Sequence, residues 1–208
     1  MERASESQEQ QSERQLGRLL RTVCADDAPG LARRLIAEYG SLAAVFSVRR
    51  DQCSHIVKDT LAAEFLSNVS ESFASALRFE VELAPIIATS QTLVDYLHLA
   101  MGCASSEQFR VLFLNSAHRL IRDEVMSAGS VTQAPVFPRE IIKRVLELGA
   151  VAIILVHNHP SGDPQPSKAD IDMTRKIASA ARCMDIAVCD HIIIARTGWI
   201  SFRALGLL

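Results

Sequence analysis

An uninterrupted apolar run, Ala150–Val156, restricts the fold of this chain more than any other feature of its sequence. The run is far shorter than the roughly 20 residues that a helix needs to cross a bilayer. Its length and its valine and isoleucine content are instead typical of a strand buried inside a sheet. The sequence therefore predicts a buried strand here, in a protein that does not cross a membrane.

The second half of the chain combines strands with helices. Pro138 suits the first turn of a helix, and Ile141 and Val145 lie on one face of the residues that follow. Helices are expected at 138–148 and, after the buried strand, at 168–183. Alternating or β-branched segments predict further strands at 109–114, 118–127, 186–189, 192–195 and 199–202. The fold class predicted for this half is mixed α/β.

The first half of the chain is predicted to be helical. Residues 1–13 are rich in Glu, Gln and Ser and lack apolar periodicity, which predicts a disordered tail. A helical N-terminal domain then extends over 14–84, and Pro85 marks its boundary with a domain at 85–208. That second domain begins with a helix at 92–101. Apolar spacings predict N-terminal helices at 16–23, 31–39, 42–47 and 59–84.

Composition and charge narrow the function classes. Residues 1–84 carry 10 Lys and Arg against 13 Asp and Glu, and residues 85–208 carry 12 against 11, so neither half is a basic module. The five cysteines are scattered and form no CxxC pair, which argues against a disulfide framework and a thiolate zinc site. With a polar N-terminus that lacks the apolar segment of a signal peptide, these features predict a cytoplasmic protein.

Two histidines follow the buried strand. Side chains two residues apart in a strand point to the same face, so His157 and His159 project together, with Cα atoms roughly 7 Å apart. Ser167 stands where the next helix needs its N-cap, and Asp170 lies in the first turn of that helix. Two imidazoles and one carboxylate leave an open position on a tetrahedral Zn²⁺, as in catalytic sites. Asp172 would face about 200° away around the helix, which favours Asp170 as the third ligand.

Each part of this pattern also has a simpler interpretation. Ser167 and Asp170 alone are typical of a capping box, and a single histidine at a strand end is an ordinary polar residue. The joint pattern favours a metal site. The loop at 160–166 contains three prolines and one glycine, which restrict its conformations and hold the next helix in place.

The segment His157–Asp170 resembles the signature of the JAMM (MPN+) metalloproteases, in which HxH is followed by seven residues and SxxD. The stretches HNHPSG and PSKAD, together with DHIII at 190–194, are similar to the RadC branch of that family. This resemblance extends over about residues 90–208. It implies a cytidine-deaminase-like α/β/α domain and a zinc-dependent peptidase or isopeptidase that acts on a protein or peptide.

The resemblance also implies roles for individual residues. Zinc would bind His157, His159 and Asp170, and Ser167 would donate a hydrogen bond to the developing oxyanion. These enzymes use a glutamate just before the first strand of the domain as acid and base, and Glu107 stands at that place. Spacing alone does not select Glu107 among the glutamates of the chain.

Asp190 and His191 match the RadC pattern as well. Two interpretations stay open for them. They could support the metal ligands or face the substrate, or they could be an ordinary polar pair at the start of a strand.

The N-terminal domain resembles the helix-hairpin-helix module of RadC-like proteins only loosely. The segment at 55–60 stands where a glycine hairpin is expected and contains no glycine, so backbone amides are not readily presented to a DNA phosphate. DNA binding is therefore weakly supported. Two alternatives to a peptidase remain: a DNA-associated repair or accessory protein whose metal site is structural or serves a nuclease step, and a partner-binding scaffold.

Overall fold

The computed structural model describes residues 8–24, 26–48, 53–86, 90–129 and 136–208. The chain divides into two compact units, residues 1–73 and 74–208. This division lies inside the long helix α5 (Thr60–Leu83), whereas the sequence places the domain boundary after that helix, at Pro85. The difference arises because Leu77 and Val81, in the last turns of α5, pack into the core of the second unit.

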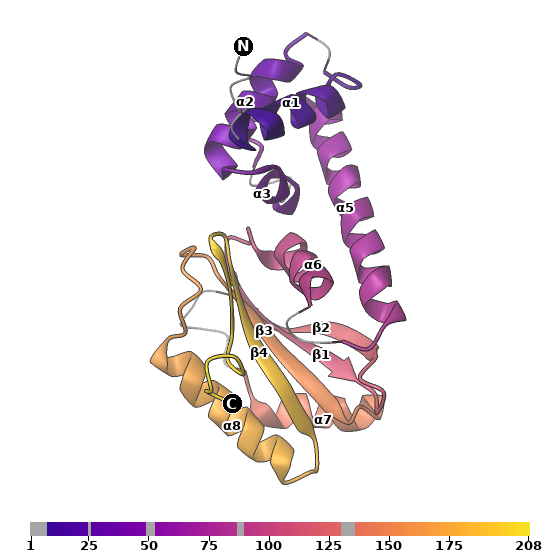
Figure 1. The fold of residues 1–208 in the computed structure, drawn as a ribbon, viewed down its shortest axis with the longest axis vertical. Coiled ribbons are helices and arrows are strands. Elements are labelled where there is room, and N and C mark those ends of the chain that lie inside the picture. Colours follow the sequence, from indigo (N-terminus) through magenta and orange to yellow (C-terminus); the bar gives the residue numbers. More distant parts are fainter. Residues whose placement is uncertain (1–7, 25, 49–52, 87–89, 130–135) are drawn as a thin grey trace, which may run out of the picture. The chain divides into compact units, whose positions relative to one another are not determined.

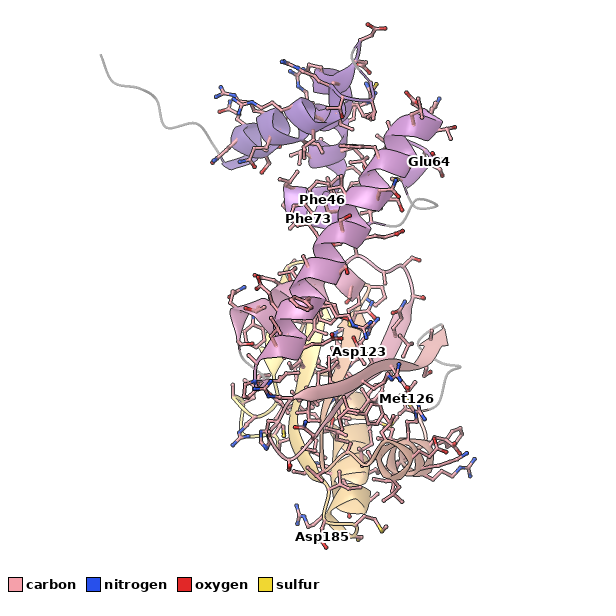
Figure 2. The ribbon with its side chains drawn as sticks, turned by 90° about the vertical axis from the view of Figure 1, so that its right-hand side faces the viewer. Phe46, Glu64, Phe73, Asp123, Met126 and Asp185 are labelled. Carbon is pink, nitrogen blue, oxygen red and sulfur yellow. The ribbon has the colours of Figure 1, made fainter. Side chains whose placement is uncertain are left out.

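Helices make up the regular structure described in the first unit. They are α1 (Gln8–Leu20), α2 (Ala28–Tyr39), α3 (Leu42–Ser47) and the first part of α5. The side chains of Leu16, Leu35 and Ile36 are fully buried where α1 and α2 pack together. The rings of Phe46 and Phe73 join α3 to α5, with centroids 5.9 Å apart (Figure 2).

Helix α1 begins earlier than expected. The disordered tail expected at 1–13 is replaced by helix from Gln8 onward, while residues 1–7 lie outside the described residues. Glu, Gln and Arg are good helix formers, and the buried Leu16 and Leu20 anchor the helix against its neighbours. Extending an anchored helix avoids the cost of nucleating a new one, so these polar residues continue it.

The second unit is built on a five-stranded mixed sheet in the order β2-β1-β3-β4-β5. Its elements are α6 (Gln91–Met101), β1 (Glu107–Leu114), β2 (Leu120–Gly129), α7 (Pro138–Leu148), β3 (Ala152–His159), α8 (Lys168–Arg182), β4 (Ala187–Ala195) and β5 (Gly198–Ser201). Strands β3 and β4 are parallel, and every other neighbouring pair is antiparallel. The predicted mixed α/β fold is confirmed.

Strand β3 is buried on both faces, and its successive residues pack in two different clusters. Helix α6 lies on one side of the sheet, and α7 and α8 lie on the other (Figure 1). Ile154 and Val156 pack in one cluster with residues of α6, such as Leu97. Ile153 and Leu155 pack in a second cluster with residues of α7 and α8. Because side chains alternate along a strand, His157 and His159 continue the face that carries α7 and α8.

Strand β4 corrects the sequence analysis, which predicted two strands, at 186–189 and 192–195. One strand spans both segments, with a β-bulge where Ile153 pairs with Val188 and Ile154 pairs with Asp190, so that Cys189 is left over. Asp190 does not interrupt the strand because its buried carboxylate accepts three hydrogen bonds. The donors are the main-chain N–H of His191, the hydroxyl of Ser201 and the main-chain N–H of Arg203, at 2.7, 2.5 and 3.0 Å.

None of the described helices combines the length and the apolar character that crossing a membrane requires.

Removing side-chain volume from β3 should destabilise the second unit. Leu155 is 0% exposed, so Leu155→Ala should lower the free energy of unfolding by about 2–5 kcal/mol. The matched control is Leu146→Ala, because Leu146 is 57% exposed on α7 and its truncation should cost less than about 0.5 kcal/mol. Denaturant unfolding of both variants measures the difference, and equal losses would contradict this assignment of the core.

Candidate metal centre

Three segments meet at the end of β3. Strand β1 pairs with β3 so that Phe109 lies opposite His157, and continuing this antiparallel register places Glu107 opposite His159. The first turn of α8 adds Asp170 from the same side. Ligand atoms of Glu107, His157, His159 and Asp170 all lie within 4.8 Å of one another. Residues far apart in the sequence thus form one cluster of side chains that could hold a metal ion.

The spacing inside this cluster fits a tetrahedral metal ion. The Nε2 atoms of His157 and His159 are 2.9 Å apart. Each lies 3.4 Å from a different carboxylate oxygen of Asp170. Ligands bound at about 2.0–2.1 Å in a tetrahedron lie roughly 3.3–3.4 Å from one another. The histidine-to-aspartate distances match this value and the distance between the imidazole nitrogens is shorter, so the donor set lies close to the arrangement of a tetrahedral site, with Glu107 as a further carboxylate at its rim.

Both imidazoles are held by their other nitrogen. The Nδ1 atom of His159 lies 2.8 Å from the main-chain oxygen of Asp163, and Nδ1 of His157 lies 2.8 Å from Nε2 of His191. A carbonyl oxygen can only accept, so His159 carries a proton on Nδ1, and its Nε2 faces the cluster. Metal-bound histidines commonly have such a partner on the outer nitrogen.

A hydrogen bond to Gly162, the residue before Asp163, holds the loop after β3 in place. Gly162 adopts φ +89°, a conformation that favours glycine, and its carbonyl accepts a hydrogen bond of 2.6 Å from the hydroxyl of Thr197. The loop is thereby tied to the turn between β4 and β5. The hydrogen bond to Gly162 therefore also helps to position the main-chain oxygen of Asp163, which accepts from His159.

The cluster shifts the pKa values of its members. Burial raises the pKa of the Asp170 carboxyl, but hydrogen bonds and charge from His157 and His159 outweigh burial and hold it well below its usual range. The hydrogen bond to Asp170 raises the pKa of His159 above its ordinary value. Burial, followed by the charge of His157, holds the pKa of His191 well below its ordinary value. Asp170 is accordingly an ionised carboxylate, and His191 is a neutral imidazole.

The capping box is present as well. Ser167 Oγ accepts a hydrogen bond from the main-chain N–H of Asp170 at 3.2 Å, and the Asp170 carboxylate accepts one from the main-chain N–H of Ser167 at 2.7 Å. The two interpretations of this pair are therefore compatible, because the cap orients the carboxylate toward the histidines. Asp172 instead lies on the helix surface, where its Oδ1 is 4.0 Å from a guanidinium nitrogen of Arg175.

Asn158 is a residue of this site that the sequence analysis did not single out. Its side chain is 1% exposed on the opposite face of β3 from the two histidines. Its Oδ1 accepts from the main-chain N–H of Gln108 at 2.8 Å, and its Nδ2 donates to the main-chain oxygen of Ser106 at 3.2 Å. Asn158 thus holds the backbone on both sides of Glu107. A buried amide between two histidines was the available signal.

Thr174 is a second such residue. It lies one helical turn after Asp170, and its hydroxyl is 2.6 Å from Nδ1 of His191. The aromatic rings of Phe109 and Phe202 flank His191, with centroids 5.7 and 4.5 Å from the imidazole. The spacing of four residues from a candidate ligand was its signal in the sequence.

A comparison with known families identifies the second unit. A family model described as the RadC-like JAB domain matches residues 87–207, which is more than half of the chain. This chain belongs to the RadC-like JAB domain family. The predicted resemblance is thereby confirmed, and every residue of the cluster lies within the matched range. The JAB domain family includes metalloproteases, which agrees with a metal-binding group at this place.

Metal binding by this RadC-like JAB domain should depend on Asp170 and not on Asp172. In Asp170→Asn the amide oxygen can still accept the cap hydrogen bond, but the anionic ligand is lost, so Zn²⁺ binding should be strongly weakened. Asp172→Asn is the matched control and should bind Zn²⁺ as the wild type does. Metal content after purification and calorimetric titration measure this. Equal binding by both variants would contradict the ligand set.

Proposed function

We propose that this protein is a zinc-dependent peptidase or isopeptidase that hydrolyses an amide bond in a protein or peptide. The observation that carries the proposal is the grouping of His157, His159 and Asp170. The two imidazole Nε2 atoms lie 2.9 Å apart, each lies 3.4 Å from one of the two carboxylate oxygens of Asp170, and Glu107 belongs to the same cluster. Three protein ligands leave the fourth position of a tetrahedral ion open for chemistry. His₂Asp ligation suits Zn²⁺.

Bound zinc supplies Lewis acidity, which lowers the pKa of a water molecule at the site and polarises the substrate carbonyl. Glu107 acts as general base and then as general acid. It accepts a proton from the attacking water and delivers it to the nitrogen of the leaving amine. Asn158 supports this role, because its hydrogen bonds to Gln108 and Ser106 keep the Glu107 backbone in place while the proton moves.

Ser167 stabilises the developing oxyanion in this proposal. Its oxygen already accepts a hydrogen bond from the main-chain N–H of Asp170. The capping bond uses a lone pair and not the hydroxyl proton, so the O–H group is able to donate to substrate. The exposed position of Ser167 at the start of α8 agrees with a group that meets substrate.

The proposal extends to the fold and the setting of the protein. The sheet flanked by α6 on one face and by α7 and α8 on the other supports a deaminase-like α/β/α domain. We assign the helical N-terminal part an adaptor role, as an all-α unit related to the helix-hairpin-helix module. Its segment at 53–60 has no residue with positive φ among the described ones, which does not favour DNA contact through backbone amides. The cytoplasm is the proposed location.

A peptide and isopeptide cleavage screen with the zinc-loaded protein tests the activity. Cleavage should stop when a chelator is added and return with Zn²⁺. Glu107→Gln should lower turnover by about 10²–10⁴-fold while Zn²⁺ content stays unchanged, because the proton carrier is lost and the ligands are kept. Cleavage that survives chelation would sink the proposal. Salt-dependent binding to duplex DNA without any amide cleavage would favour the accessory role instead.

Removal of the Ser167 hydroxyl should impair turnover and leave the metal bound. Ser167→Ala should lower kcat by about 10²–10³-fold. Since alanine also removes the N-cap, Ser167→Gly is the companion variant, because glycine costs only a few tenths of a kcal/mol at that position. Both variants should lose similar activity on a proven substrate. Unchanged turnover of either one would remove the oxyanion role.

A further inference from the structure

A chain of three hydrogen bonds links one candidate ligand to the helix that carries another. His157 Nδ1 lies 2.8 Å from His191 Nε2, and His191 Nδ1 lies 2.6 Å from Thr174 Oγ1. Thr174 Oγ1 in turn lies 2.6 Å from the main-chain oxygen of Asp170. His191 and Thr174 are each 1% exposed, so these contacts are shielded from water.

The donor and the acceptor of each hydrogen bond in this series are assigned by starting from its last member, the main-chain oxygen of Asp170. A carbonyl oxygen only accepts, so the Thr174 hydroxyl donates to the main-chain oxygen of Asp170. The reverse direction would leave two oxygen lone pairs facing each other at 2.6 Å. With its proton used, the hydroxyl can only accept from His191, which must therefore carry N–H on Nδ1.

The same reasoning fixes His157. His191 is 1% exposed and lies between the rings of Phe109 and Phe202, an apolar setting that disfavours a charged imidazolium. A neutral imidazole has one N–H, so Nε2 of His191 is an acceptor once Nδ1 is the donor. His157 then donates from Nδ1 to His191. Its Nε2 carries a lone pair and faces His159 and Asp170, which is the form that binds a metal ion.

The β-bulge at Cys189 is what brings His191 to this place. In regular pairing Ile154 would lie opposite Cys189, and His191 would be shifted to the other face of the sheet. With Cys189 left over, Leu155 pairs with His191, which then lies beneath His157 on the face toward α8. Bulges in parallel strands are rare, and bulges often redirect a side chain next to a functional site.

We propose that Thr174 and His191 are positioning residues that hold His157 with its proton on Nδ1, so that Nε2 is ready for the metal ion. This inference rests on the proposed metal site and deepens it. Thr174 acts on His157 only through His191. The Thr174 hydroxyl and the Asp170 ligand lie one turn apart on α8, so the same helix sets the third ligand and the proton arrangement of the first.

The test compares Thr174→Val with Thr174→Ser. Valine keeps the shape of threonine and removes the acceptor of His191 Nδ1, whereas serine keeps the hydroxyl. In Thr174→Val, His191 is free to move its proton to Nε2, which turns it from an acceptor into a donor toward His157. Zn²⁺ affinity should fall by about 10–100-fold in Thr174→Val and stay close to wild type in Thr174→Ser.

A second pair of variants tests His191, the middle residue of this series of hydrogen bonds. In His191→Gln the side-chain amide oxygen can accept from His157 Nδ1, so this variant should bind Zn²⁺ more tightly than His191→Leu. Competition with a chromophoric chelator measures all four affinities without any activity assay. Equal affinity of Thr174→Val and wild type, or of His191→Leu and His191→Gln, would overturn the inference.

Nitrogen-15 NMR of the metal-free protein separates this inference from the proposed function. Long-range nitrogen-proton correlations distinguish the two imidazole tautomers, and His157 should carry its proton on Nδ1 in wild type and Thr174→Ser. A proton on Nε2 in the wild type would overturn the positioning role. If the wild type binds Zn²⁺ with the expected tautomer of His157 but cleaves no peptide or isopeptide, the positioning role stands and the proposed zinc hydrolase fails.

Discussion

Burial of β3 on both faces is the constraint on which the rest of the second unit depends. Apolar side chains of this strand pack alternately against α6 and against α7 and α8. A slip of one residue in the strand register would move every side chain to the opposite face of the sheet, where it would meet the wrong helices. The same alternation continues past Val156. It sends His157 and His159 to the α8 side and Asn158 to the other, where Asn158 secures the segment that carries Glu107.

Buried polar side chains lie beside this core at little cost because each one forms hydrogen bonds with the next. His157, His191 and Thr174 form a chain that ends on a main-chain oxygen, and Asp190 is surrounded by three donors. Leaving any one of these groups unpaired would cost about 1–3 kcal/mol, so the network favours a single arrangement. A site that is already ordered loses less free energy when it binds an ion or a substrate.

Local signals predicted most elements well. Helix α7 spans the predicted 138–148, with Pro138 in its first turn and Gly149 in the left-handed region at its end. The polar pair at 190–191 led to a prediction of two strands, because two of the three donors that satisfy Asp190 come from residues beyond the next turn. Helix α1 extends into polar residues for a similar reason, since Leu16 and Leu20 find their partners in another helix.

The sequence by itself determined the candidate ligands, because period-two alternation and helix capping are local rules that place His157, His159 and Asp170 on converging ends of consecutive elements. The family resemblance indicated Glu107 and His191, but only the tertiary structure decided how they reach these ligands. Glu107 reaches the cluster through the pairing of β1 with β3, and His191 reaches it through a bulge in β4. Strand register and bulges depend on packing between segments distant in the sequence, and no local pattern encodes that packing.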